Sequence, residues 1–557
     1  MTRVTSLTVA FSTALGSCAT DMKQQDITLA IVNARVWTAN PRQPWASGVA
    51  VAGDSIVSVG SSAEIAKLAK ASPNARVIDA KGGFVGPGFI DSHVHFIDGG
   101  YRLSSVQLRD AKTPQEFTAR IKEYAATLSP GTWITGGDWD HQQWGGELPT
   151  KDWIDSVTPN NPVWVARLDG HMALANTAAM TAAKVTKATP DVDGGTIVRD
   201  PSGNPTGVFK DNAQSYVNAV EPSRPPELDD RALQAAMKYV AERGATSVHN
   251  MGGFVDLAAF ERARASKTLV TRIFAVTPIA QWERLRDTVA KRGKGDEWVR
   301  IGGLKGFVDG SLGSHTAAMF APFTDTPKDS GFLVETEKDL YEWTSSADKA
   351  GLQPIVHAIG DRAINTQLNI FERVAKENGP KDRRFRIEHA QHIAPADIPR
   401  FAKLGVIPSM QPYHAIDDGR WAEKVIGPER AKTTYAFRSL RDAGARLAFG
   451  SDWFVAPPTP LEGIYAAVTR RTLDDKNPKG WVPEQKISVE DALKAYTINA
   501  AFASFDEGIK GSLERGKLAD IVVLDRDITT IPPETIRDTR VLFTIVGGRV
   551  VFEAASK

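Results

Sequence analysis

Eight short apolar runs, most of them separated by helical patterns, lie in the middle of this 557-residue chain and constrain its fold more than any other feature. Continuous apolar runs of this kind are typical of strands buried on both faces, and their alternation with helices is typical of a parallel sheet. Eight of them favour an α/β fold closed into a (β/α)8 barrel over an open sheet. The runs span residues 84–96, 162–168, 246–251, 299–308, 353–357, 385–389, 405–410 and 446–451, and the helical patterns include 231–243, 338–350, 364–378 and 396–404.

The two chain ends share a different pattern, in which short β-type runs are broken by turn residues, at residues 26–84 and 506–557. Because a lone hairpin or two is only marginally stable, we expect both ends to pair into one small β-sandwich domain. The barrel would then occupy residues 85–505, well above the ~250 residues typical of this fold. The surplus predicts insertions near residues 98–160 and 176–243, the second of which contains a predicted hairpin lid.

Composition excludes several classes of function. Lys and Arg number 67 against 66 for Asp and Glu, and this balance argues against a nucleic-acid-binding protein, which needs a basic excess. The single cysteine argues against a disulfide framework and against a zinc cluster built from cysteines. The chain has no Gly-x-Ser-x-Gly elbow, so a serine hydrolase is unsupported.

Residues 1–25 differ from the rest of the chain. Arg3 gives the segment a weakly positive n-region, and residues 4–15 are mildly apolar. Leu15-Gly16-Ser17-Cys18 then resembles a bacterial lipobox, in which the cysteine is lipidated. The segment predicts a signal peptide, a lipid anchor at Cys18 and a periplasmic or membrane-anchored location. The alternative is an N-terminal extension on a cytoplasmic enzyme. Elsewhere in the sequence, no stretch approaches the ~20 apolar residues of a transmembrane helix.

Potential metal ligands lie where the apolar runs end, on the face of a (β/α)8 barrel that carries active sites. They are His93, His95, His357, His389 and Asp452. Residues i and i+2 of a strand point the same way, so His93 and His95 can bind one cation together. Such nitrogen and oxygen ligands suit zinc, and less commonly manganese, iron or nickel. A lone histidine at a strand end is usually structural, but the joint pattern predicts a site for a divalent ion.

The predicted ion determines the chemistry of the site. A bound divalent cation lowers the pKa of its water to near 7, which provides a nucleophile at neutral pH. Asp452, which follows the eighth run, can accept the proton of that water as general base. Spacing alone implies one metal ion.

Six segments of the chain resemble the amidohydrolase superfamily of metal-dependent hydrolases, and within it the amidohydrolase-3 group, which includes N-substituted formamide deformylase. The segments are residues 86–95, 305–314, 357–363, 387–389, 450–452 and 516–524, and the resemblance covers nearly the whole chain after residue 25. It implies a barrel with a terminal β-sandwich and two divalent ions, with Zn²⁺ as the expected metal.

The resemblance also assigns the ligands by position. It implies that His93, His95 and Asp452 bind the first ion, that His357 and His389 bind the second, and that Asp452 is the general base. It further suggests a homo-oligomer.

Lys305 lies inside the fourth apolar run, where an ammonium group is costly unless it is paired or modified. The resemblance implies that carbon dioxide carboxylates this lysine and that the resulting carbamate bridges both ions. A cation would thereby become an anion that faces two cations.

Two histidines outside the ligand set are candidates for contact with substrate. The resemblance implies that His171 faces the site, where it can polarise the scissile carbonyl as a catalytic residue; a hydrogen bond that fixes its loop is the alternative. His315 stands where related sequences usually have arginine, so it is a candidate substrate-binding residue, with a surface loop position as the alternative.

Tryptophans on segments that follow strands or lie in insertions can line an apolar pocket; they are Trp139, Trp144, Trp153, Trp421 and Trp453, and of these Trp139 and Trp453 are the predicted substrate contacts. Ordinary packing is the alternative for each. His141 and His414 are candidates for the rim of the pocket.

These observations predict a metal-dependent hydrolase that uses a metal-bound hydroxide to cleave a non-peptide C–N bond of a small linear amide, of the N-substituted formamide or N-acyl amine type. One alternative is a mononuclear deaminase or cyclic-amide hydrolase of the same superfamily, against which Lys305 counts. Others are a hydrolase of N-acyl amino acids, carbamates or esters, and a non-catalytic binding protein on the same fold.

Overall fold

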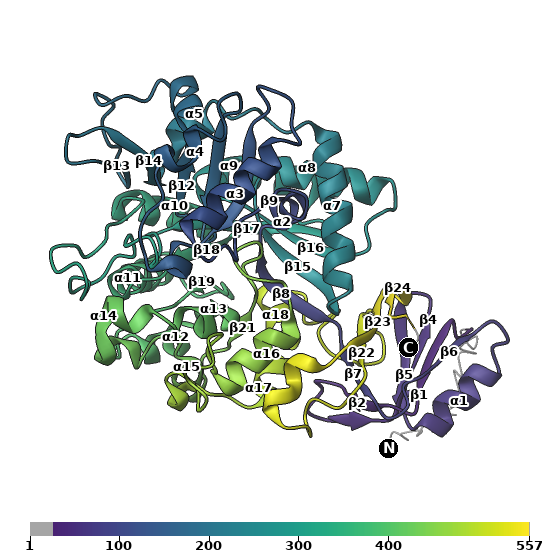
Figure 1. Cartoon of the computed structure of the whole chain (residues 1–557). Coiled ribbons are helices and arrows are strands. Elements are labelled where there is room, and N and C mark those ends of the chain that lie inside the picture. Colours follow the sequence, from purple (N-terminus) through teal and green to yellow (C-terminus); the bar gives the residue numbers. More distant parts are fainter. Residues whose placement is uncertain (1–25, 556–557) are drawn as a thin grey trace, which may run out of the picture.

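Eight parallel strands form the central sheet of the computed structural model, which describes residues 26–555 (Figure 1). Their order in the sheet is β8 (Phe89–Val94), β15 (Ala245–Met251), β16 (Arg272–Pro278), β17 (Val299–Phe307), β18 (Gln353–Ala358), β19 (Arg386–His389), β20 (Ile407–Met410) and β21 (Ala448–Phe449). Two backbone hydrogen bonds join the edge strands just beyond their ends: Asp452 N donates to His93 O at 2.7 Å, and His95 N donates to Trp453 O at 2.6 Å. They close the sheet, and the predicted (β/α)8 barrel is confirmed.

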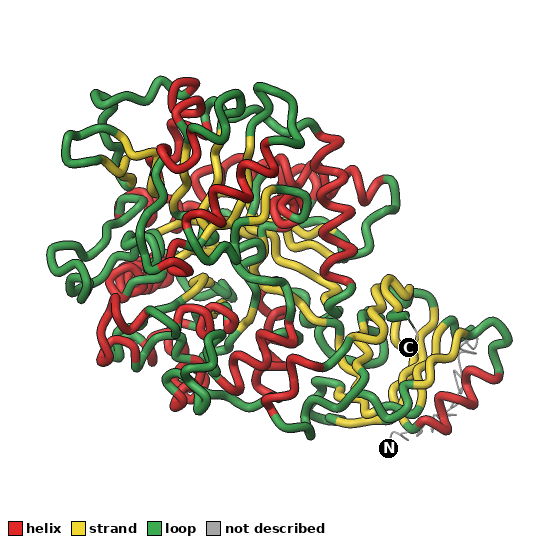
Figure 2. Tube along the Cα trace, in the orientation of Figure 1, coloured by secondary structure: helices red, strands yellow, loops and turns green. Residues whose placement is uncertain are grey.

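Helices follow the barrel strands and surround the sheet (Figure 2). In α11, the buried residues Ile364, Leu368 and Phe371 recur at intervals of four and three, which places them on one face against the strands. The barrel helices are α2 (Phe96–Arg102), α7 (Pro226–Ala241), α8 (Phe254–Ala265), α9 (Trp282–Arg292), α10 (Glu337–Lys349), α11 (Asp361–Glu377), α12 (Ile398–Leu404), α13 (Pro412–Asp418), α14 (Ala422–Ala431), α15 (Phe437–Asp442), α16 (Pro460–Thr469), α17 (Val489–Ala495) and α18 (Ile498–Ala503). The four helical patterns expected from the sequence correspond to α7, α10, α11 and α12.

The prediction of the barrel strands was wrong at one place. Residues 162–168, predicted as a barrel strand, form β11 (Val163–Arg167), which lies outside the barrel. The eighth barrel strand is instead β16, which was not predicted and pairs with β15 and β17. Both segments are buried short strands, and no local pattern distinguishes the sheet to which such a strand belongs.

The two predicted insertions and the segment between them, which holds β11 and β12, contribute the strands of one additional sheet. Its strand order is β13 (Gly195–Arg199), β14 (Pro205–Asp211), β12 (Met172–Ala175), β11, β10 (Ile134–Trp139) and β9 (Val106–Gln107). The expected hairpin is the antiparallel pair β13–β14. The helices α3 (Pro114–Ala125), α4 (Lys151–Asp155), α5 (Thr177–Ala182) and α6 (Ser215–Asn218) belong to the same stretch of chain.

Both chain ends contribute to a pair of smaller sheets at one side of the barrel, where the purple and yellow strands meet in Figure 1. One sheet has the order β5 (Ser55–Gly60), β4 (Gly48–Ala52), β1 (Leu29–Val32), β6 (Arg76–Asp79), and α1 (Ser62–Lys70) packs on it. The other has the order β24 (Arg549–Glu553), β23 (Val541–Val546), β22 (Ile521–Leu524), β7 (Phe84–Pro87), β2 (Arg35–Trp37), β3 (Trp45–Ala46). One apolar core, which includes Leu29, Val49 and Ile521, joins the two ends.

The first apolar run of the sequence divides between two sheets. β7 pairs with β22 in the terminal sheet, and β8 pairs with β15 in the barrel, so the chain crosses at Gly88. A Cβ atom at Gly88 would lie 2.4 Å from the Thr246 hydroxyl oxygen, which explains the need for glycine at the crossing.

The predicted signal segment and Cys18 lie outside the described residues, and they stay a prediction. Within residues 26–555, no helix has both the length and the apolar character that crossing a membrane requires.

A buried ion pair connects the barrel to the terminal sheets. Arg272 on β16 donates from Nε and Nη2 to the two carboxylate oxygens of Asp520, at 2.7 and 3.0 Å, and both side chains are almost fully buried. Removal of one partner leaves the other as an uncompensated buried charge.

We therefore expect Arg272→Met to lower the free energy of unfolding by about 3–5 kcal/mol, measured by urea unfolding. Arg76→Met is the matched control, because Arg76 and its partner Glu553 are about half exposed, and an exposed pair contributes at most ~1 kcal/mol. Equal unfolding curves for the two variants would contradict the role given to Arg272.

Candidate metal centre

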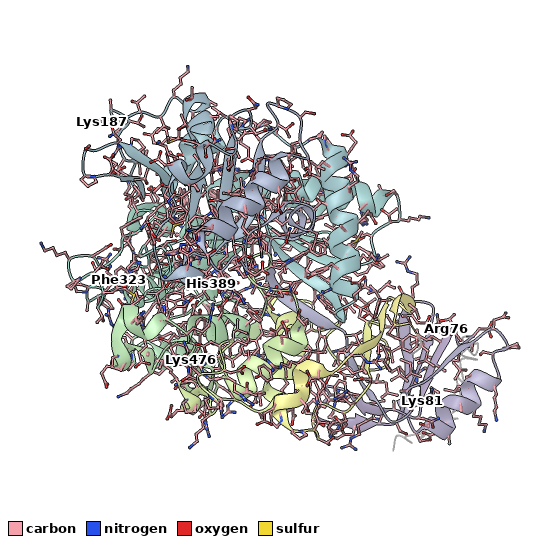
Figure 3. All side chains as sticks on the ribbon, in the orientation of Figure 1. Arg76, Lys81, Lys187, Phe323, His389 and Lys476 are labelled. Carbon is pink, nitrogen blue, oxygen red and sulfur yellow. The ribbon has the colours of Figure 1, made fainter. Side chains whose placement is uncertain are left out.

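The predicted ligands lie together at the carboxyl ends of the barrel strands, near the labelled His389 at the centre of Figure 3. Strands β8, β17, β18 and β19 carry four of them, which are His93, Lys305, His357 and His389. The other two are His95, one residue after β8, and Asp452, three residues after β21. All are buried except His95, whose side chain is 26% exposed. The structure thus brings together side chains that are far apart in the sequence.

One group of possible ligands contains His93, His95 and Asp452, whose ligand atoms all lie within 4.8 Å of one another. Asp452 Oδ1 is 3.3 Å from His93 Nε2 and 3.4 Å from His95 Nε2. Lys305 Nζ is also 3.3 Å from His93 Nε2. Two imidazoles and a carboxylate at this spacing are a suitable donor set for a divalent cation.

A second group shares Asp452 and contains His389 and His414. The sequence predicted His414 only at the rim of the pocket. His357 lies beside this group, with its ring centroid 4.5 Å from that of His389, but its Nε2 is 2.9 Å from the carbonyl oxygen of Gly310.

The electrostatics of the buried histidines suit metal binding. Burial lowers the pKa values of His93, His357 and His389 well below the ordinary range, and the neighbouring Lys305 contributes to each shift. These imidazoles are therefore neutral, which is the form with a lone pair for a metal.

Two buried charged residues for which the sequence predicted no role, Glu388 and Arg386, orient His93. Glu388 Oε2 is 2.5 Å from His93 Nδ1, so Nδ1 donates to the carboxylate and Nε2 is left for a metal. Arg386 donates to Glu388 Oε1 at 2.9 Å and to Ser92 O at 2.7 Å. The available signal was the pair of charges two residues apart in an apolar strand, since buried charges require partners.

Asp91 holds the loop that carries Asp452. Its carboxylate accepts hydrogen bonds from Ser451 N at 2.8 Å and Ser451 Oγ at 2.6 Å, and it also accepts one from His93 N at 3.2 Å. The first and last barrel strands are therefore tied together directly beneath the metal ligands.

A pocket with about 600 Å³ of empty space, including its open mouth, lies over the second ligand group. Its wall includes His171, His357, His389, His414 and Asp452.

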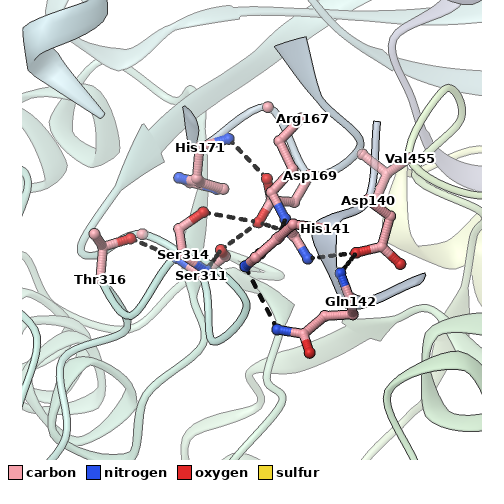
Figure 4. A network of polar contacts seen from close by, with 12 residues as sticks. Asp140, His141, Gln142, Arg167, Asp169, His171, Ser311, Ser314, Thr316 and Val455 are labelled. Atoms are coloured by element: carbon pink, nitrogen blue, oxygen red, sulfur yellow. Dashed lines mark hydrogen bonds and ion pairs between the residues drawn. The ribbon is translucent and has the colours of Figure 1, made fainter. Parts of the chain in front are cut away.

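The insertion sheet supplies another part of the wall through a network of polar contacts (Figure 4). Arg167, at the end of β11, pairs with Asp140 at 3.2 Å and with Asp169 at 2.5 Å. Asp169 also accepts hydrogen bonds from Ser311 Oγ at 2.5 Å and Ser314 Oγ at 3.1 Å. The network links the insertion to the loop after β17, so the insertion is fixed against the barrel at the pocket.

His171 faces the same pocket, next to the predicted metal ligands. Its Nδ1 is 2.6 Å from Asp211 Oδ1, and its ring centroid is 5.0 Å from that of His357. Burial disfavours the charged imidazole, but the carboxylates of Asp211, Asp169 and Asp309 outweigh that effect and raise the pKa of His171 above its ordinary value. The raised pKa favours the protonated ring, in which both nitrogens donate hydrogen bonds.

The remaining substrate candidates do not line the pocket. Trp139 lies in the apolar core of the insertion, where its Nε1 donates to Val165 O at 2.8 Å. Trp453 stacks on Tyr239 with ring centroids 5.3 Å apart. His315 is paired with Asp325 at 3.0 Å. Of the five tryptophans proposed for the pocket, Trp421 is the one that lines it. His141 is buried and accepts a hydrogen bond from Arg167 Nε at 3.2 Å.

Residues 76–552 match the model of the amidohydrolase family. The chain belongs to the amidohydrolase family. It is 41% identical over 539 residues to Protein LONG AFTER FAR-RED 3 of Arabidopsis thaliana, which covers 94% of this chain and 91% of that protein. It is 28% identical to N-substituted formamide deformylase of Arthrobacter pascens, with 94% and 98% covered. The crystal structure of an uncharacterized metal-dependent hydrolase from Pyrococcus horikoshii is similar at a TM-score of 0.74 and 28% identity, with 91% and 99% covered.

As an amidohydrolase, the chain is a metal-dependent hydrolase, and the His and Asp groups described above are its candidate metal ligands. The resemblance inferred from the six sequence segments is thereby confirmed at the level of the family.

Glu388→Gln is expected to weaken metal binding by about 10–100-fold, because the neutral amide no longer fixes His93 in its ligating tautomer. Metal content after dialysis against buffered free zinc measures the effect. Glu372→Gln, a change to a surface carboxylate on α11, is the control and should retain wild-type affinity. Circular dichroism establishes that each variant is folded. Unchanged zinc affinity in a folded Glu388→Gln would contradict this role.

Asp418 on the pocket wall should make stability depend on pH. Its Oδ2 accepts hydrogen bonds from Tyr435 at 2.5 Å and Gln391 at 2.8 Å, and burial raises the pKa of Asp418 to about 7. The folded chain then binds a proton that the unfolded chain releases near pH 4, so this contribution to stability is complete below pH ~4 and is lost as the pH rises through ~7.

We expect Asp418→Asn to flatten the fall in the thermal unfolding midpoint between pH 4 and 7. Asp382→Asn, at a carboxylate that is 60% exposed, should keep the wild-type profile. Parallel wild-type and Asp418→Asn profiles would show that Asp418 does not titrate in this range.

Proposed function

We propose that this amidohydrolase cleaves a non-peptide C–N bond of a small linear amide, of the N-substituted formamide or N-acyl amine type. The observation that carries the proposal is the convergence of His93, His95 and His389 on Asp452, which lines the pocket together with His389 and His171. The similarity to a protein named N-substituted formamide deformylase supports the substrate class.

We further propose two Zn²⁺ ions as cofactors. His93, His95 and Asp452 would hold the first, and His357 and His389 would hold the second. The shared position of Asp452 in both ligand groups supports a pair of neighbouring ions. When bound, the ions supply an acidified water and a polarised carbonyl.

A carboxylated Lys305 would bridge the ions. Burial lowers the pKa of Lys305 to about 8, which increases the fraction of neutral amine that can attack carbon dioxide. The amine forms a C–N bond to carbon dioxide and loses one proton, and an anionic carbamate results. Its position 3.3 Å from His93 Nε2 supports a role at the metal centre.

Residues of the chain itself would transfer the proton and bind the substrate. Asp452 takes a proton from the attacking water and gives it to the leaving amine. His171 holds its Nδ1 against Asp211, which leaves Nε2 to donate to the carbonyl oxygen as negative charge develops there. The wall formed by Arg167, Asp140 and Asp169 bounds the space for the rest of the substrate.

A substrate panel with zinc-loaded protein tests the reaction class. Formamides and N-acyl amines are expected to turn over faster than N-acyl amino acids, carbamates, esters, aryl amides or cyclic amides. Asp452→Asn should lower kcat/KM by about 10²–10⁴-fold, as expected for loss of a general base, and by more if metal is also lost. No release of amine from any linear amide would contradict the proposal.

His171→Asn should lower kcat by about 10²–10³-fold while zinc content is unchanged, because it removes a donor to the oxyanion and no proposed metal ligand. His315→Asn is the matched control, since its imidazole is paired with Asp325 away from the pocket, and it should keep wild-type turnover. Loss of zinc from His171→Asn would instead make His171 a metal ligand.

A further inference from the structure

His414 is a partly buried histidine whose position the proposed ligand set does not explain. It lies on the first turn of α13, directly after the seventh barrel strand, β20, and it lines the pocket. Its Nε2 is shielded from solvent and has no hydrogen-bond partner among the described residues. Buried polar atoms in native proteins are nearly always paired, so this nitrogen requires a partner.

The geometry identifies the kind of partner. The ligand atoms of His414, His389 and Asp452 lie within 4.8 Å of one another, a spacing at which one cation can contact all three. Gln411 Oε1 accepts from His389 Nδ1 at 2.8 Å, so His389 Nε2 remains available as a ligand.

The two oxygens of Asp452 face different histidines. Oδ1 is the atom near His93 and His95, at 3.3 and 3.4 Å, whereas Oδ2 lies on the side of the His389 ring, 4.0 Å from the Nδ1 atom that pairs with Gln411. A carboxylate arranged in this way can contribute one oxygen to each of two ions.

His357 belongs to neither three-residue group. Its Nε2 donates to Gly310 O at 2.9 Å, which leaves Nδ1 as its available nitrogen, so the ligand set of the second ion has room for a further residue beside His357 and His389. We propose that His414 is a ligand of the second cation, together with His389 and Asp452. This inference rests on the proposed two-ion function and adds to it a ligand from the seventh strand.

Zinc stoichiometry and affinity test the inference without any measurement of turnover. Wild type, His414→Gln and the control His315→Gln are equilibrated against buffered free zinc, and bound zinc is counted by mass spectrometry. We expect two ions in wild type and in His315→Gln, and a second ion bound more than 10-fold more weakly in His414→Gln, since loss of even an outer partner of a ligand costs about 10–100-fold. Substitution with Co²⁺ should show a changed visible spectrum in His414→Gln only.

A second variant protects the test against misfolding. His414→Asp keeps a donor atom and should bind the second ion more tightly than His414→Gln, and circular dichroism reports the fold of both. Two ions bound at wild-type affinity in His414→Gln would overturn the inference, as would equal binding by the Gln and Asp variants. A single ion in wild type would also overturn it, whereas the proposed function fails only if the substrate panel shows no hydrolysis of amides.

Discussion

The closure of the barrel between β8 and the segment after β21 is the constraint on which the site depends. Asp91 on the first strand binds Ser451 through both its backbone and its hydroxyl, and Asp452 N donates to His93 O in the next contact. The ligand group of His93, His95 and Asp452 exists only because these contacts bring together residues some 360 positions apart. The same hydrogen bonds therefore complete the fold and assemble the first metal group.

Burial then determines how the ligands behave. In a dry environment the imidazoles are neutral and Lys305 is easier to deprotonate, so the cluster is poor in positive charge before any cation binds. Glu388 is the exception, a buried carboxylate that needs compensation, and it receives it from Arg386 on the same face of β19. The pair orients His93 without adding net charge to the centre.

The insertion sheet contributes to the site differently, by forming one wall of the pocket rather than by providing metal ligands. Arg167 and Asp169 lie at the end of β11, and Ser311 and Ser314 in the loop after β17 hold Asp169 in place. Specificity for the substrate can therefore change through the insertion while the strand ends that carry the ligands stay fixed.

The sequence was sufficient to predict the barrel, because the alternation of apolar runs and helical patterns is visible in the local sequence and reflects which segments are buried. It was not sufficient to assign each strand to its sheet: β11 and β16 are equally buried, and only tertiary pairing separates them. The ligand candidates of the metal centre were predictable because strand ends of a parallel barrel share one face.

Contacts that depend on side-chain direction were not predictable in this way. Tryptophan is a residue type that often lines ligand pockets. Trp139 nevertheless points into the core of the insertion, where its indole N–H donates to Val165 O. His414 was placed only at the rim, because it follows its strand by four residues and nothing local indicates that a helical turn directs it back toward Asp452.

The position of His414 also bears on how the second ion would be held. His93 and His95 come from a strand and the residue after it, both fixed by the hydrogen bonds of the closed barrel. His414 instead belongs to the short helix α13, which follows β20 and also carries Asp418, a residue of the pocket wall. A cation bound there would be coupled to that wall, and the wall encloses the substrate. Substrate recognition and occupancy of the second site would then depend on the same helix, whereas the first site would depend on the barrel alone.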